Sequence, residues 1–168
     1  MIKRNEAPAS VWRNPVHFLA FGLGSGAAPY APGTFGTLAA IPIYLLLMLL
    51  PLGAYLGVVL LMALVGIWLC DVTSKDLGVH DHSGIVWDEF VGYLITMVPA
   101  FGIAAAASWM WIVVGFFLFR FFDIVKPWPI RQVDRHVMGG WGIMLDDILA
   151  GVYAGVVLQI AVMILNRI

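Results

Sequence analysis

Charged residues are scarce in this sequence. Only 11% of its 168 residues are Asp, Glu, Lys or Arg, whereas 62% are hydrophobic. An ordinary soluble domain has about 25% charged and about 45–50% apolar residues. The composition therefore predicts a membrane protein, and the length suggests one domain over residues 1–168, with residues 1–13 as a polar N-terminal tail.

Cysteine and basic runs are also nearly absent. The single cysteine, Cys70, lies in an apolar segment, so no disulfide framework is expected. No set of Cys and His residues has the spacing of a zinc site. The net charge of −1 and the lack of basic runs interleaved with aromatics argue against a nucleic-acid partner.

Long uncharged runs make up much of the sequence. Residues 14–70 and 90–119 carry no charge, and the breaks at 51–53 and 99–102 contain Pro and Gly. Most of the resulting segments would rise about 25–30 Å as helices, enough to cross a bilayer. The sequence predicts an all-α membrane helical bundle of about five hydrophobic helices. They are expected near 34–50, 53–70, 85–98, 103–122 and 147–166, and the third is short.

Two polar stretches, 71–89 and 120–147, contain every acid except Glu6. They can meet only if the third and fourth segments form a hairpin that turns at 99–102. With the N-terminus inside, every basic residue except Arg167 then lies on the cytoplasmic side. The polar loops, and any site they form, are therefore expected on the cytoplasmic face.

Acids gather where polar chain meets apolar chain. These boundary acids are Asp88, Glu89, Asp123, Asp146 and Asp147. An ionised carboxylate is costly there unless it is paired. We expect the last two to begin the final helix, where simple capping is the alternative interpretation. Carboxylates are also the ligands of Mg²⁺.

Two further residues stand beside these acids. His80 and Asp81 precede the Asp88–Glu89 pair in a loop. Hydrogen bonding or proton transfer is the functional interpretation of such a histidine. An ordinary solvated loop is the alternative.

Basic residues and a glycine-rich segment could bind phosphate. Arg120 and Asp123 share a helix face, and two prolines stop that helix just after Lys126. These cations could contact a phosphate or only attract lipid headgroups. The glycine- and hydroxyl-rich segment 22–42 precedes a helix and suits phosphate binding. Its candidate residues are Ser25, Gly33, Thr34 and Thr37.

Other phosphatase classes lack their motifs here. Cys70 is not followed by a phosphate loop, and no Asp-x-Asp or vanadium-type Ser-Gly-His motif is present. Four blocks resemble the phosphatidylglycerophosphatase A family. They read GSGAAPYAPGTFGTLAAIP, GVHDHSGIVWDEFVG, FRFFDIVKPWPI and GGWGIMLDDILAG. The resemblance implies a Mg²⁺-dependent hydrolysis of phosphatidylglycerophosphate to phosphatidylglycerol, by a helical bundle in the bacterial inner membrane.

The resemblance and the residue patterns together give a site prediction. Asp88, Glu89, Asp146 and Asp147 are expected to hold Mg²⁺, and Asp123, His80 and Asp81 complete the candidate catalytic set. Arg120, Lys126, Ser25, Gly33, Thr34 and Thr37 are expected to bind the phosphate of the phospholipid substrate. Metal-activated water is the expected nucleophile, with an aspartate nucleophile left open.

Two other functions remain open at this stage. A phosphatidyltransferase that uses a CDP-activated lipid would also need membrane carboxylates and Mg²⁺, but its Asp-Gly-x-x-Ala-Arg core is missing. An ion-coupled transporter would place acids along an ion path. Here the acids cluster at the ends of segments instead.

Overall fold

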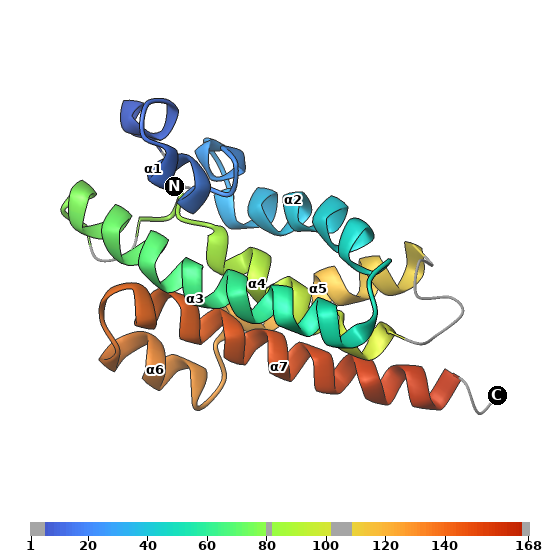
Figure 1. The fold of residues 1–168 in the computed structure, drawn as a ribbon. Coiled ribbons are helices and arrows are strands. Elements are labelled where there is room, and N and C mark those ends of the chain that lie inside the picture. The colour runs from blue at the N-terminus through green and yellow to red at the C-terminus, as the bar shows by residue number, and fades with distance from the viewer. Residues whose placement is uncertain (1–5, 80–81, 102–108, 166–168) are drawn as a thin grey trace.

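A computed structural model describes residues 6–79, 82–101 and 109–165 of the chain. The described residues contain helices and no strand, which confirms the predicted all-helical fold (Figure 1). The α-helices are α1 (Pro15–Ala20), α2 (Pro32–Leu47), α3 (Leu52–Leu77), α4 (Trp87–Thr96), α5 (Trp109–Val125), α6 (Ile130–His136) and α7 (Gly139–Leu165). Short 3₁₀ helices span Ala9–Trp12, Ser25–Ala27 and Val98–Ala100.

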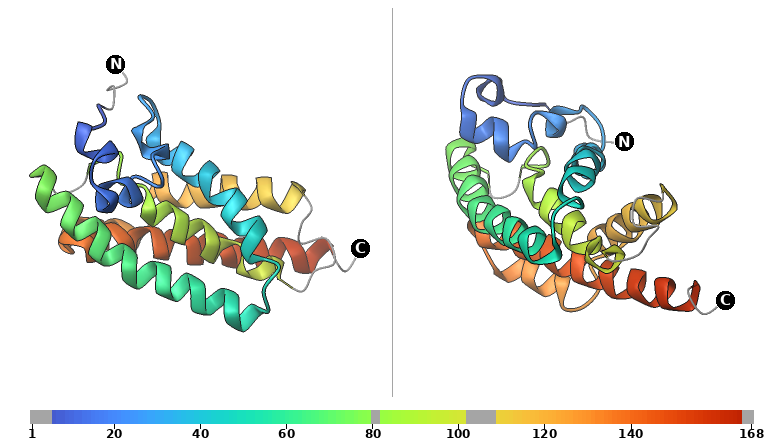
Figure 2. Two further views of the ribbon diagram at one scale, coloured as in Figure 1. Left: turned by 45° about the horizontal axis from the view of Figure 1, so that its top comes forward. Right: turned by 45° about the vertical axis from the view of Figure 1, so that its right-hand side comes forward.

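Helix α4 lies at the centre of the bundle. It is surrounded by α2, α3, α5 and α7, and it packs most extensively on α7 (Figure 2). Its side chains Phe90, Tyr93 and Leu94 are fully buried. Ten residues rise only about 15 Å, half of a hydrocarbon core. The short third segment of the sequence is thus an enclosed core helix and does not cross a bilayer on its own.

Two helices have the length and composition to cross a membrane. Among the described residues these are α3 and α7. Each exposes an apolar stripe of side chains spaced about one turn apart. On α3 the stripe is Leu56, Leu60, Leu64 and Trp68, and on α7 it is Val152, Val156, Ile160 and Met163. Large exposed apolar surfaces are unusual in soluble monomers and are typical of lipid-facing helices.

Glycines set the close approach of α4 and α7. A Cβ at Gly151 would collide with the carbonyl oxygen of Gly92, and a Cβ at Gly92 would lie 2.7 Å from the carbonyl oxygen of Asp147. The hydroxyl of Thr96 lies 2.9 Å from the Gly92 carbonyl oxygen and 3.3 Å from that of Gly151, and it donates to both. This contact holds the second half of α4 beside the middle of α7.

The N-terminal segment is tied to α3 by one buried histidine. His17 Nδ1 lies 3.0 Å from Ser10 Oγ, and His17 Nε2 lies 3.1 Å from Asp76 Oδ2. Val11 is fully buried within the 3₁₀ helix Ala9–Trp12. The part of the expected polar tail that the structure describes is therefore packed against the bundle.

Candidate active site

Three carboxylates meet where α4 begins. Asp88 and Glu89 lie in the first turn of α4, and Asp147 lies about two turns inside α7. One oxygen of each lies within 4.8 Å of the others. The three residues are only 9%, 8% and 2% exposed. The structure thus brings together acids that lie far apart in the sequence.

The expectation that Asp146 and Asp147 begin the last helix is wrong. Helix α7 begins at Gly139, whose φ of +70° suits glycine. The amide of Gly140 donates to Asp71 Oδ1 at 3.3 Å, so an acid on α3 caps this end. In the sequence the glycines around residue 140 fell within the polar stretch 120–147. In the fold they let α7 pack against the backbone of α3 at Ile67.

Arg120 faces the trio from α5. Its Nη1 atom lies 2.7 Å from Asp123 Oδ2 and 3.6 Å from Glu89 Oε1. The two polar stretches of the sequence therefore meet, as predicted. The Arg120 side chain is only 15% exposed. Its guanidinium charge offsets part of the buried negative charge.

One guanidinium does not balance this group of acids. Glu89 Oε2 and Asp147 Oδ2 are buried and have no hydrogen-bond partner in the part of the chain that the structure describes. Burying an uncompensated carboxylate costs several kcal/mol. A divalent cation would remove that cost, and a set of oxygen donors suits Mg²⁺ rather than zinc. The residues present therefore fit a Mg²⁺ ion.

Lys126 forms a second charged group next to the first. It follows the end of α5 in a left-handed conformation, with φ of 43°. Its Nζ lies 2.6 Å from both Asp134 Oδ1 and Asp146 Oδ2. Burial lowers the pKa of Lys126, but the charge of Asp146 and its bonds to both carboxylates outweigh burial and raise the pKa above its ordinary value. Asp146 therefore pairs with Lys126, and the trio does not include it.

The start of α2 closes one side of the trio. A Cβ at Gly33 would collide with Glu89 Oε1 and would lie 3.0 Å from Arg120 Nη1. A Cβ at Gly36 would lie 3.3 Å from Glu89 Oε2. These glycines bring the helix N-terminus, with its partial positive charge, close to Glu89. The sequence analysis predicted phosphate binding at Gly33. In the structure Gly33 lies beside the Glu89 carboxylate and the Arg120 guanidinium.

The hydroxyl candidates differ in their surroundings. Ser25 Oγ donates to the Gly22 carbonyl at 2.7 Å, and Thr37 Oγ1 donates to the Gly33 carbonyl at 2.9 Å. Both hydroxyl protons are thus used in local backbone structure, and Thr37 is fully buried. Thr34 is half-buried at the start of α2. His80 and Asp81 lie outside the described residues.

The sequence analysis did not single out two acids whose contacts the structure shows. Asp71 caps α7 from 69 residues away, and Asp134 of α6 shares Lys126 with Asp146. The only sequence signal for Asp71 was Lys75 one turn later, which pairs with it at 2.7 Å. Asp134 had no such signal, because its contact with Lys126 depends on the turn between α5 and α6.

Comparison with known proteins gives consistent matches over most of the chain. A sequence model of the family described as phosphatidylglycerophosphatase A matches residues 18–162. The phosphatidylglycerophosphatase A of Escherichia coli is 51% identical over 86% of this chain and 82% of its own length. The protein of the same name from Haemophilus influenzae is 49% identical over 86% of each chain.

A third relative carries a different name. A Bacteroides thetaiotaomicron protein, provisionally named a phosphatidylinositol-3-phosphatase, is 40% identical over 83% of this chain and 89% of its own length. No solved structure matches the chain.

Proposed function

Because the chain belongs to the phosphatidylglycerophosphatase A family and is thus a phosphatase, we propose that its substrate is phosphatidylglycerophosphate. Water would replace the alcohol at the terminal phosphate, giving phosphatidylglycerol and inorganic phosphate. The observation that carries this proposal is the buried trio of Asp88, Glu89 and Asp147 beside Arg120 in a chain with this family membership. The competing transferase and transporter functions have no such support.

We further propose that the trio holds Mg²⁺. Glu89 Oε2 and Asp147 Oδ2 are buried and have no hydrogen-bond partner among the described residues, so they are the first candidate ligands. Asp88 completes the set. When bound, Mg²⁺ stabilises the charge that builds on the phosphoryl oxygens during transfer.

Basic side chains would orient the phosphate. Arg120 is held by Asp123, so its planar guanidinium presents donors from a fixed position. Lys126 is positively charged at neutral pH, because its contacts with Asp146 and Asp134 raise its pKa. We propose that the Lys126 ammonium group gives up one of its two carboxylate contacts, with Asp134 or with Asp146, when a substrate phosphate binds. Asp123 is close enough to Arg120 to fix its orientation, which is the role we assign to it.

The proposed location is the bacterial inner membrane, with the site toward the cytoplasm. Helices α3 and α7 have the length and composition to cross it, and the family relatives are bacterial. With the N-terminus inside and a hairpin at 99–102, every basic residue except Arg167 would lie on the same side as the site, which supports this orientation. The headgroup would then reach the trio while the acyl chains stay in the bilayer.

The test is phosphate release by the purified protein in mixed micelles. Phosphatidylglycerophosphate, phosphatidylinositol 3-phosphate and phosphatidic acid are compared at equal surface concentration, with Mg²⁺ or with a chelator. We expect the highest kcat/KM on phosphatidylglycerophosphate, and loss of activity with the chelator. Preference for the inositol lipid would contradict the substrate, and full activity in the chelator would contradict the metal.

A further inference from the structure

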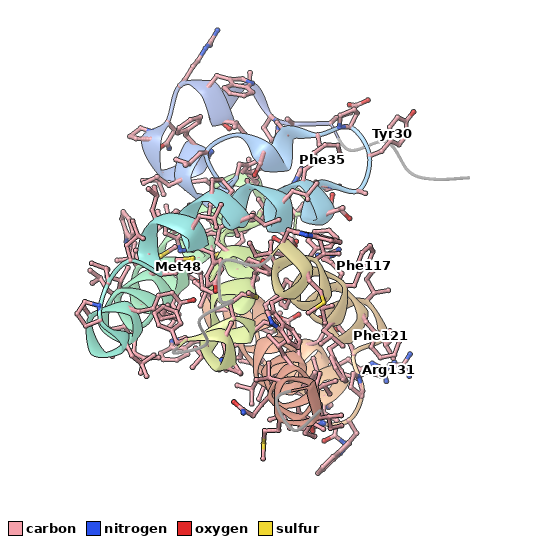
Figure 3. The ribbon with its side chains drawn as sticks, turned by 90° about the vertical axis from the view of Figure 1, so that its right-hand side faces the viewer. Tyr30, Phe35, Met48, Phe117, Phe121 and Arg131 are labelled. Atoms are coloured by element: carbon pink, nitrogen blue, oxygen red, sulfur yellow. The ribbon has the colours of Figure 1, made fainter. Side chains whose placement is uncertain are left out.

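A shallow groove runs along the outer face of α5. It has a volume of about 570 Å³. Its lining residues are Val113, Val114, Phe117, Leu118, Arg120, Phe121 and Ile124, which we call the α5 groove. Phe117 and Phe121 lie on the same side of the molecule as Phe35 of α2 and Arg131 of α6 (Figure 3). All the lining side chains except Arg120 are hydrophobic.

Arg120 connects the α5 groove to the candidate active site. The same guanidinium lines the groove and lies 2.7 Å from Asp123 and 3.6 Å from Glu89. The start of α2 covers Glu89 and Arg120 on another side, because Gly33 packs directly against both. The α5 groove is thus an apolar surface that shares one charged side chain, Arg120, with the candidate active site.

The direction of the groove suits an amphiphile. Lys126 and the polar turn after it mark one end of α5, and Arg120 lies less than two turns before that end. From Arg120 back to Val113 the helix rises about 10 Å, away from the polar turn and along exposed apolar side chains. A molecule with a phosphate at Arg120 would therefore lay an apolar tail toward Val113.

We propose that the α5 groove holds an acyl chain of the phospholipid substrate, so that the lipid enters the site sideways along α5. This inference rests on the proposed function. Its distinguishing observation is the continuity between groove and site through Arg120. A lipid-facing stripe without such continuity, as on α3, would contact bulk acyl chains without directing a headgroup to the carboxylates.

The first test fills the groove and compares two substrates. Val113→Trp places a large ring in the groove, and Val65→Trp on α3 is the matched control. The two valines are 40% and 37% exposed. Each variant is assayed on a long-chain phosphatidylglycerophosphate and on a short-chain, water-soluble analogue with the same headgroup. For Val113→Trp we expect kcat/KM on the long-chain lipid to fall about tenfold, the loss of contact for roughly two methylene groups.

The control and the short-chain substrate give the expected contrasts. Activity of Val113→Trp on the short-chain analogue, and of Val65→Trp on both substrates, should stay within about twofold of the unmodified protein. An equal loss on both substrates would show that Val113 acts through the site or the fold, and would overturn the proposal. An unchanged kcat/KM on the long-chain lipid would overturn it as well.

The second test does not depend on turnover. A phosphatidylglycerophosphate analogue with a photoreactive group in one acyl chain is crosslinked to the protein, and the labelled peptides are identified by mass spectrometry. We expect labelling on α5. Excess unlabelled phosphatidylglycerophosphate should suppress this labelling, whereas phosphatidylcholine should not. Uniform labelling of α3, α5 and α7, insensitive to competitor, would overturn the proposal.

Two other outcomes have distinct meanings. Light scattering in detergent could show that the unmodified protein is a dimer and the Val113→Trp variant is a monomer. A second copy of the chain would then cover the α5 groove, and the proposal would be overturned. If the unmodified protein releases no phosphate from either chain length, the proposed function fails, whereas the crosslinking pattern still decides whether a phosphate-bearing lipid occupies α5.

Discussion

At the scale of single residues, the negative charges of the trio can be removed one at a time. Glu89→Gln and Asp147→Asn keep the shape of the side chain but remove the negative charge from two carboxylates, each of which has a buried oxygen with no partner in the described part of the chain. We expect each change, and Asp88→Asn, to lower kcat by about 10² or more, the range seen when one stabilising group is removed from a catalytic site. Phosphate release is the measurement. Glu6→Gln, at an exposed position, is the matched control and should keep normal turnover.

Metal binding at the trio should also be visible without catalysis. A ligand that binds only the folded protein stabilises it, by about 2.7 kcal/mol at 100 times its Kd. We expect Mg²⁺ to raise the thermal midpoint of the unmodified protein in detergent and to leave that of Glu89→Gln nearly unchanged. An equal rise in both proteins would place the stabilising ion elsewhere.

Lys126 has two possible roles that kinetics can separate. If it contacts the transferred phosphate, Lys126→Met should lower kcat by about 10²–10³ at every salt concentration. If it only attracts headgroups, the loss should appear in KM and fade at high salt, worth about 1 kcal/mol. Arg131→Met, on the exposed surface of α6, is the comparison. We expect the first pattern for Lys126 and the second for Arg131.

The pH dependence of Lys126 follows from the same contacts. Its pKa is raised above the ordinary value of 10.5, so the cation is present in both the folded and unfolded states below that pH. Its stabilising effect is lost only as pH rises through the raised pKa. From about pH 6 to about pH 9 the pH–rate profile should therefore carry no limb from this lysine.

At the scale of the helices, the contact of α4 with α7 is sensitive to small changes in side-chain size. A methyl group at Gly151 would meet the Gly92 carbonyl oxygen, so Gly151→Ala should destabilise the protein by about 1–3 kcal/mol. Gly57→Ala on α3 meets nothing within 4 Å and should be neutral or stabilise by up to about 1 kcal/mol. Thermal unfolding in detergent measures both. A stable Gly151→Ala variant would show that the two helices can separate at no cost.

The helices were easier to predict than their ends. Long uncharged runs located α2, α3, α5 and α7, because burial in a lipid or a core excludes charge over whole segments. The start of α7 was misplaced because its N-terminal cap, Asp71, comes from another helix. The pairing of Lys126 with Asp146 was missed for the same reason. Local pattern identifies an element, whereas the ends and charge pairs depend on neighbours that only the fold supplies.

At the scale of the whole molecule, the site lies at one end of the bundle. The start of α4 and the end of α5 meet there, while the turn between α2 and α3 lies at the other end (Figure 1). In a chain whose buried Cys70 is replaced by Ala, single cysteines at exposed Ser83 and Gln132 should be labelled from the cytoplasmic side. A cysteine at Leu49, which is 79% exposed in the α2–α3 turn, should be labelled from the opposite side.

Labelling of intact cells and of inverted membrane vesicles with an impermeant thiol reagent decides this orientation. Labelling of the Ser83→Cys variant in intact cells would contradict the proposed topology. Labelling of all three cysteines from one side would instead show that α2 and α3 form a hairpin that does not cross the membrane.

The enclosed position of α4 has a consequence for how the protein is made. Every residue of α4 is buried or half-buried, and its first turn carries Asp88 and Glu89. Such a segment is too short and too acidic to enter a bilayer by its own hydrophobicity. Its partners α2 and α3 are synthesised before it, but α5 and α7 come after it. A nascent chain therefore lacks Asp147, the third carboxylate of the trio, until the first turns of α7 have been synthesised, and a product that ends before α7 cannot assemble the trio.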